Sequence, residues 1–512
     1  MDFLLKNKIY LLPIVVVALM FGYFFYFSFN FDMFNDDYLL LNNIYESKNF
    51  IKIFQKINSA YRNMEMFDFI LIYDMEFYGK YFMTSVFMSS IFVIFMYVLS
   101  WYVNFRFLFT VKNKILQDSK IFLSVFIIFI AINNSLHNLF WYSSIMCHVF
   151  NEMLLFLMMV SYVRLFSSST FEKMKNKGFV YKFLLCCYLL ILSYLIGNGT
   201  ETTALFAILV IFLLVIYLIK KYKKIYFWYF IPFITLCYGL YNQVVVLNPR
   251  DYIDKNKFLL DKFNHFFVYF CKNLWFGYKY FLVFILGYLI VLSLNYFKKI
   301  NIVNRKDFNI ASLFLLGFFI NLAILVILLR LDMFLYHPLL NPFDYKVVFN
   351  LPRWYTMADV FLGLFVLYFC WFLIKEFKHK KNIKYIIGLL FFVILSNFVM
   401  NNIIIIKNSN YYSQYLIKPK HELITKIKNE ISINGCYIIN SKDISILFLG
   451  GYTPNKDDFK MFDNKNIDFK LGQGGYNFIV TVFNKILYYK KIDVNKIKLE
   501  GSCDLKDTKV KK

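Results

Sequence analysis

The sequence predicts an all-α polytopic membrane protein of about 11 transmembrane helices, followed by a small C-terminal extracytoplasmic α/β domain. Composition is the first reason: 60% of the 512 residues are hydrophobic and only 17% are charged, which is more apolar surface than a water-soluble domain can bury. The second reason is that the apolar residues form runs of about 18 or more, long enough as helices to cross ~30 Å of hydrocarbon. The bilayer is therefore the expected solvent for most of the chain.

The candidate spans divide the chain into two domains. The transmembrane domain is predicted at 1–406, with a long first outer loop at 31–80, and the C-terminal domain at 407–512. The first apolar run is longer than a signal-peptide core and has no small-residue cleavage site after it, so we expect it to be retained. The candidate spans lie at 10–29, 81–109, 121–136, 145–166, 180–196, 203–219, 225–243, 266–296, 310–330, 357–374 and 385–406.

Basic residues predict how these spans are oriented. Lys and Arg gather in every second connection, which is typical of the cytoplasmic side, whereas the connections at 137–144 and 197–202 contain neither. The N-terminus is then cytoplasmic, and an odd number of spans leaves the C-terminal domain outside. The basic connections contain Lys112, Lys114 and Lys120; Lys173, Lys175 and Lys177; Lys220, Lys221, Lys223 and Lys224; Lys298, Lys299, Arg305 and Lys306; and Lys375, Lys378, Lys380 and Lys381.

The net charge is +25, but most of the basic residues lie in these short connections, where they orient the chain across the membrane. Nucleic acid is therefore not an expected partner. Lys, Asn, Ile, Phe and Tyr are abundant relative to Arg, Ala and Gly, a bias that resembles the proteome of an AT-rich bacterium. The predicted location is therefore the bacterial inner (cytoplasmic) membrane, with membrane lipids as partners.

The C-terminal domain has signals of both strands and helices. Short apolar segments at 436–440, 444–449 and 477–483 are bounded by Gly, Asn and Asp, which predicts strands. The segment 421–433 has helical spacing. Cys436 and Cys503 both fall in this domain and could form a disulfide if it is exported.

Ionisable residues lie at the predicted outer ends of several spans. Asp36 and Asp37 follow the first span, and Lys80 ends the first outer loop, after segments suited to lying on the membrane surface. Arg353 precedes the tenth span and Glu201 opens the sixth. Each has a structural alternative: a solvated loop for the aspartates, interfacial snorkelling for Lys80, a lipid anchor for Arg353 and a helix-dipole contact for Glu201.

Aromatic residues and a histidine are predicted on the same outer side of the membrane. Trp141 and Tyr142 precede the fourth span, where such residues are either belt anchors or sugar-stacking platforms. His148 lies inside that span and is followed by Glu152. An ionisable group within a span tends to face a cavity, although a packed, hydrogen-bonded His148 is an equally good interpretation.

These residues resemble the GT-C superfamily of integral membrane glycosyltransferases, in particular bacterial members similar to O-antigen glucosyltransferases. The resemblance covers scattered parts of about the first 360 residues. It rests on four short features: Asn35-Asp36-Asp37-Tyr38 after the first span, Gly79-Lys80 at the end of the first outer loop, Trp141-Tyr142-Ser143, and Gly197 with Glu201.

The resemblance implies transfer of a sugar from a polyprenyl-phosphate-linked donor to a cell-envelope glycan or lipid acceptor, with inversion. Asp36 would be the general base, with Asp37 as the alternative, and Lys80 and Arg353 would stabilise the departing phosphate. Glu201 would bind a sugar hydroxyl or help to orient the acceptor. Trp141, Tyr142 and His148 are the remaining candidates for substrate binding.

Two departures and two alternatives accompany this hypothesis. Lys80 replaces the commoner Arg, which removes a bidentate phosphate clamp, and no nucleotide-binding fingerprint follows a predicted strand. No cofactor is predicted with certainty, and the carboxylates are compatible with a divalent metal. The alternatives are a transporter or flippase of lipid-linked oligosaccharide, which would use charged groups near the midplane, and an O-antigen-type polymerase with a long outer loop at 248–265 or 331–355.

Overall fold

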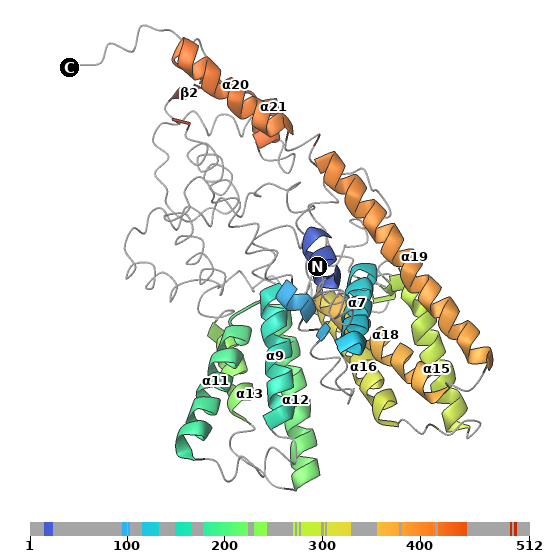
Figure 1. Cartoon of the computed structure of the whole chain (residues 1–512). Coiled ribbons are helices and arrows are strands. Elements are labelled where there is room, and N and C mark those ends of the chain that lie inside the picture. The colour runs from blue at the N-terminus through green and yellow to red at the C-terminus, as the bar shows by residue number, and fades with distance from the viewer. Residues whose placement is uncertain are drawn as a thin grey trace, which may run out of the picture.

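The computed structural model describes a chain whose elements are almost entirely helices (Figure 1). Six helices within the described residues are long and apolar enough to cross a membrane, so the prediction of an all-α membrane protein is confirmed. The described residues are 15–23, 95–99, 101–102, 115–132, 149–165, 178–223, 230–242, 270–271, 274–275, 278–297, 302, 305–328, 356–377, 381–412, 414, 418–447, 492–493 and 496–498.

The long apolar helices coincide with predicted spans. They are α11 (Phe179–Gly197), α12 (Glu201–Tyr222), α15 (Leu282–Tyr296) with the preceding 3₁₀ turn η6 (Lys279–Phe281), α16 (Arg305–Leu328), α18 (Thr356–Glu376) and α19 (Lys381–Tyr412). Shorter apolar stretches lie in α7 (Ile115–Ile132), α9 (Phe150–Leu165) and α13 (Ile231–Tyr241), each within another predicted span. The total of about eleven spans stays a prediction.

Helix α18 is the centre of the bundle. In its apolar stretch 83% of the residues are buried, compared with 17% in α19 and 24% in α11. A helix that is apolar on all sides and enclosed by others is a core helix, whereas α19 and α11 expose rows of large apolar side chains. Those rows are suited to lipid contact. Helix α19 runs along one edge of the bundle (Figure 1).

The aromatic ring of Phe361 joins four helices. Its centroid lies 6.0 Å from that of Phe156 on α9, 4.6 Å from Phe206 on α12 and 5.9 Å from Phe314 on α16. Phe156, Phe206 and Phe361 each lie only five or six residues after the start of their helix, a rise of about 9 Å at most. Helices α9, α12 and α18 therefore begin close together.

Helices α16 and α18 pack tightly and run in opposite directions. Gly317 on α16 faces Phe361, and a Cβ there would lie 2.5 Å from the ring. At the other end of the pair, Lys375 in the last turn of α18 donates a 2.9 Å hydrogen bond to Asp307 in the first turn of α16. The opposite directions agree with the alternation predicted for consecutive spans.

Two further contacts hold the outer helices. Helices α11 and α13 cross at Gly197 and Gly239, where a Cβ on Gly197 would lie 2.7 Å from the carbonyl oxygen of Leu236. Only glycine permits so close an approach of two backbones. Asn401 on α19 donates hydrogen bonds of 2.8 and 3.0 Å to the last carbonyls of α7, at Ile130 and Ala131, which are otherwise unsatisfied at a helix end.

The C-terminal region contains both helices and strands. Helix α20 (Lys418–Asn434) leads to strand β1 (Tyr437–Ile438), which pairs in parallel with β2 (Ile497–Lys498). The predicted helix at 421–433 and the beginning of the predicted strand at 436–440 agree with these elements. Helix α19 continues past the predicted domain boundary at 406, to Tyr412. Cys436 is disulfide-bonded.

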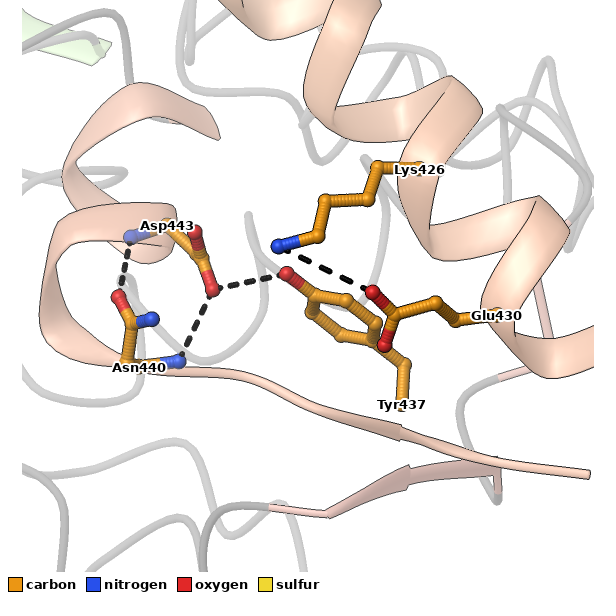
Figure 2. Close-up of polar contacts among 5 residues, drawn as sticks. All are labelled: Lys426, Glu430, Tyr437, Asn440 and Asp443. Carbon is orange, nitrogen blue, oxygen red and sulfur yellow. Dashed lines mark hydrogen bonds and ion pairs between the residues drawn. The ribbon is translucent and has the colours of Figure 1, made fainter. Parts of the chain in front are cut away.

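The strand predicted at 444–449 is wrong for its first four residues, because helix α21 (Ser441–Leu447) occupies 444–447; 448 and 449 lie outside the described residues. A capping box explains the helix: the Asp443 amide donates to Oδ1 of Asn440 at 2.9 Å, and the Asn440 amide donates to Oδ2 of Asp443 at 3.2 Å (Figure 2). This reciprocal pair satisfies the first amides of a helix and favours its start over an extended strand. The third predicted strand, 477–483, lies outside the described residues.

Candidate functional site

Two carboxylates are buried near the common starting end of the helices that meet at Phe361. Glu152 is in the first turn of α9 and Asp359 in the first turn of α18. Glu152 is 1% exposed and Asp359 is 0% exposed. Acidic side chains at this position complement the helix dipole. An ionisable group enclosed in a membrane bundle is nevertheless costly and is usually retained for a function.

Each carboxylate accepts a hydrogen bond from a buried tyrosine. The Tyr97 hydroxyl donates to Oε2 of Glu152 at 2.5 Å, and the Tyr278 hydroxyl donates to Oδ1 of Asp359 at 2.8 Å. Both tyrosines are almost fully buried. Hydrogen bonds to charged acceptors are the stronger ones in proteins, so they connect the segment around Tyr97 to α9, and the start of η6 and α15 to α18.

The two carboxylates belong to one cluster. Tyr97 interacts electrostatically with Asp359 as well as with Glu152. The helix spacing explains this arrangement: Trp101 lies four residues after Tyr97 and packs directly on Gly363, which lies four residues after Asp359. Residues four apart share one helix face, so the same two faces bring Tyr97 near Asp359. We call Tyr97, Glu152, Tyr278 and Asp359 the carboxylate cluster.

The start of α12 borders the same end of the bundle. A Cβ on Gly199 would lie 2.5 Å from the Asn151 amide group on α9, next in sequence to Glu152. Thr200 is the N-cap residue of α12, but its hydroxyl donates to that of Thr203 at 2.8 Å instead of accepting from a helix amide. Glu201 is the first residue of α12.

Helix α16 contributes a buried amide near this level. Phe318 packs edge-on against Tyr278, with ring centroids 5.0 Å apart, and Asn321 follows one turn later. Asn321 is 0% exposed, and within the described part of the chain neither atom of its amide group has a hydrogen-bond partner. A buried amide that can both donate and accept is suited to a hydroxyl or water.

Most of the residues predicted for the site lie outside the described residues. These are Asp36, Asp37, Lys80, Trp141, Tyr142, His148 and Arg353. Glu201 is described only as part of the backbone of α12. No group of three or more His, Cys, Asp or Glu side chains that could hold a metal ion occurs among the described residues.

Sequence reasoning noted Glu152 as an ionisable residue within a span but missed Tyr97, Tyr278 and Asp359. A signal for Asp359 was present, since it is the only charged residue in the predicted span 357–374. Tyr97 and Tyr278 had no such signal, because the chain contains 41 tyrosines and only contact selects these two.

Fold and site together define a polytopic α-helical membrane protein with a buried carboxylate cluster at one end of its bundle. No protein-family model, curated protein or solved structure matches the chain.

Proposed function

We propose that the chain is a membrane glycosyltransferase of the GT-C type. It transfers a sugar from a polyprenyl-phosphate-linked donor to a cell-envelope glycan or lipid acceptor, with inversion at the anomeric carbon. The observation that carries the proposal is that helices α9, α12 and α18 begin together beside the carboxylate cluster. Each of these helices begins with, or is closely preceded by, a residue suited to this chemistry.

Chain connectivity supports a shared site at this end. His148 lies two residues before the start of α9, Arg353 lies three residues before the start of α18, and Glu201 opens α12. Short connections of this kind limit how far each residue extends from its helix, at no more than ~3.6 Å per residue. Because the three helices begin close together, this connectivity favours a site in which the Arg353 cation, the Glu201 carboxylate and the His148 imidazole lie in one region.

The carboxylate cluster serves as the rigid base of the site. Tyr97 and Tyr278 hold Glu152 and Asp359 through hydrogen bonds, and this fixes the ends of four helical segments relative to one another. Catalytic groups must be held in position by such supporting contacts. Glu152 and Asp359 are positioning residues in this proposal, and no atom of either takes part in bond making.

The reaction begins when an acceptor hydroxyl attacks the anomeric carbon of the sugar. Asp36 accepts the hydroxyl proton as the new carbon–oxygen bond forms, and Asp37 is the alternative base. The bond between the anomeric carbon and the phosphate oxygen breaks, so polyprenyl phosphate leaves with the bonding electrons. Lys80 and Arg353 stabilise its negative charge.

A transporter or flippase is the second candidate function, and the buried carboxylates are the observation that favours it. Their position argues against it. Both lie in the first turn of a helix, whereas a coupling site is expected near the middle of the membrane. The glycosyltransferase therefore fits the cluster better.

The orientation and location are part of the proposal. We place the common start of α9, α12 and α18 on the outer face of a bacterial inner membrane, with the C-terminal domain outside the cytoplasm. The disulfide at Cys436 supports this placement, because disulfides persist in oxidising compartments and are rare in the cytosol.

The experiment uses the full chain in lipid vesicles with a radiolabelled polyprenyl-phosphate hexose and a glycan acceptor. We expect product to form with the unaltered chain, and Asp36→Asn to abolish it while the protein remains folded and abundant. Asp37→Asn is the matched control and retains activity if Asp36 is the base. Turnover by Asp36→Asn would remove Asp36 from the mechanism, and movement of the lipid between leaflets without sugar transfer would favour the transporter.

A further inference from the structure

Lys279 is a cation at the end of the bundle that holds the carboxylate cluster. It is the first residue of η6 and directly follows Tyr278, whose hydroxyl is bonded to Asp359. Consecutive Cα atoms are ~3.8 Å apart, so the backbone of Lys279 lies beside a residue of the cluster. The Lys279 side chain is half-buried, whereas Tyr278 is almost fully buried. A positive charge therefore lies next to the proposed site, on the side formed by η6 and α15.

The Lys279 ammonium has an aromatic partner. Its Nζ lies 4.9 Å from the centroid of the Tyr280 ring, and such a cation–π contact orients the charge without neutralising it. Within the part of the chain that the structure describes, Lys279 forms no ion pair. The charge is therefore available to an anion from outside the chain.

Lys279 also lies where the apolar part of the membrane meets the head-group layer. The apolar stretch of η6 and α15 begins at this residue and continues to Tyr296. Tyr280 is 51% exposed, and Trp275, four residues before Lys279, is 58% exposed. Exposed Tyr and Trp side chains at the end of an apolar stretch are typical of the head-group level. Phosphate is the anion that membrane lipids carry at this level.

Beyond Lys279, one side of α15 is apolar and faces the lipid. Leu286 is 58% exposed and Ile290 is 60% exposed, and Leu282 and Leu289 lie on the same side at spacings of three and four residues. We call these four side chains the α15 face. Ile290 lies about 17 Å along the helix from Lys279. The α15 face is a single row on one helix, which suits one hydrocarbon chain.

We propose that Lys279 and the α15 face bind the donor lipid: the ammonium holds the phosphate, and the α15 face holds the polyprenyl chain. The identity of the donor rests on the proposed function. One cation beside one apolar row matches a lipid phosphate with a single chain, and polyprenyl phosphate has one chain where a phospholipid has two. The chain stays in the membrane while the phosphate lies beside the carboxylate cluster, so the donor enters from the α15 side.

The first test measures binding of sugar-free polyprenyl phosphate to the full chain in phosphatidylcholine nanodiscs. A photoreactive benzophenone side chain at position 286 should cross-link this lipid several times more than one at position 191, as counted by mass spectrometry of the adducts. Ile191 is the matched control, because it is 60% exposed and lies six residues before Gly197, where α11 ends. An excess of phosphatidylglycerol should leave the cross-link at position 286 unchanged.

The charge is tested by titrating the cross-link at position 286 with polyprenyl phosphate. Lys279→Gln should weaken binding about tenfold, the effect of losing one charge-assisted contact. Lys279→Arg keeps the charge and should retain most of the affinity. Lys220→Gln removes an exposed charge near the end of α12, away from α15, and should leave the affinity unchanged.

Three results would overturn the proposal. They are equal cross-linking at positions 286 and 191, equal affinity of the unaltered chain and Lys279→Gln, and loss of the cross-link when phosphatidylglycerol is added, which would indicate a site for any anionic lipid.

The sugar-transfer assay separates this proposal from the proposed function. Sugar transfer without a cross-link at position 286 would overturn the α15 site alone. A cross-link that depends on Lys279, in a chain that transfers no sugar, would support the α15 site and count against glycosyl transfer.

Discussion

Tyr278 and Asp359 lie 81 residues apart in the sequence, and the tyrosine hydroxyl donates a 2.8 Å hydrogen bond to the carboxylate in the bundle interior. This contact fixes the beginning of η6 and α15 against the beginning of α18. The Glu152 carboxylate has an equivalent tyrosine in Tyr97. The end of the bundle at which the site is proposed is therefore held by side-chain hydrogen bonds in addition to aromatic packing.

Replacing Tyr278 by Phe should destabilise the folded chain by about 1–3 kcal/mol, because a buried acceptor loses a donor. The measurement is thermal unfolding in detergent followed by intrinsic fluorescence. Tyr280→Phe is the control, since Tyr280 is 51% exposed, and it should leave the midpoint unchanged. Equal midpoints for Tyr278→Phe and Tyr280→Phe would contradict this role for the hydrogen bond.

Gly363 and Gly388 should respond to alanine in opposite directions. A Cβ on Gly363 would collide with the Trp101 ring, whereas among the described residues no atom beyond the neighbouring backbone of α19 lies within 4 Å of a Cβ on Gly388. We expect Gly363→Ala to lower stability by about 1–3 kcal/mol through overpacking, and Gly388→Ala to raise it by about 0.5–1 kcal/mol through helix propensity. Thermal midpoints compare the two, and stabilisation by Gly363→Ala would mean that Trp101 does not pack on α18.

The Asp307–Lys375 ion pair should contribute more to the stability of the folded chain than the Lys426–Glu430 ion pair on α20. Asp307 is 7% exposed and Lys375 is 49% exposed at 2.9 Å, whereas Lys426 and Glu430 are 60% and 39% exposed at 3.8 Å. Lys375→Met should destabilise by about 1–3 kcal/mol because it leaves a mostly buried charge without this partner. Adding Asp307→Asn should recover part of the loss.

Glu430→Gln provides the comparison for that experiment, and we expect a change below about 0.5 kcal/mol from this exposed pair. Chemical denaturation of the four proteins in the same detergent would rank them. A loss from Glu430→Gln as large as that from Lys375→Met would show that burial does not govern these pairs.

The capping box at the start of α21 should control local stability of the C-terminal region. Asn440→Ala removes one of its two reciprocal hydrogen bonds and should cost about 1 kcal/mol. Hydrogen exchange at the α21 amides should accelerate accordingly. Lys442→Ala, at an exposed position of the same helix, should leave exchange slow, and similar acceleration in both variants would rule out the cap as the cause.

Stability of the same region should depend on pH through Tyr437, whose ring lies between Asp443 of α21 and the Lys426 and Glu430 side chains of α20 (Figure 2). Desolvation, and after it the Asp443 carboxylate 3.0 Å away, raises the pKa of Tyr437 above its usual value of ~10. Since the folded pKa is the higher one, the contribution is fully present below about pH 10 and is lost as the pH rises beyond it.

Tyr437→Phe removes this dependence. Unfolding of the C-terminal region followed by hydrogen exchange should show the unaltered protein losing its advantage over Tyr437→Phe as the pH rises above about 10. A difference that stays constant over this range would contradict a raised pKa.

Sequence patterns predicted the helices best where a single requirement, the need to cross the bilayer, acts on a continuous stretch of the chain. The apolar spans at 180–196, 203–219 and 357–374 agree with α11, α12 and α18 to within a few residues, because helices in a bilayer must satisfy their own backbone. The segment 444–449 shows the weakness of short patterns. Its apolar residues fit a strand or a helix, and the reciprocal bonds of Asn440 and Asp443 decide for the helix.

The sequence by itself determined that this chain is a membrane protein, because the hydropathy and length of each segment decide directly whether it can span the bilayer. Only the tertiary structure decided which polar residues meet. Glu152, Asp359, Tyr97 and Tyr278 come from four separate segments, and their hydrogen bonds depend on the helix crossings set by Phe361 and by Gly363 against Trp101. Such packing depends on the three-dimensional fit of side chains from distant segments, which no periodicity within one segment records.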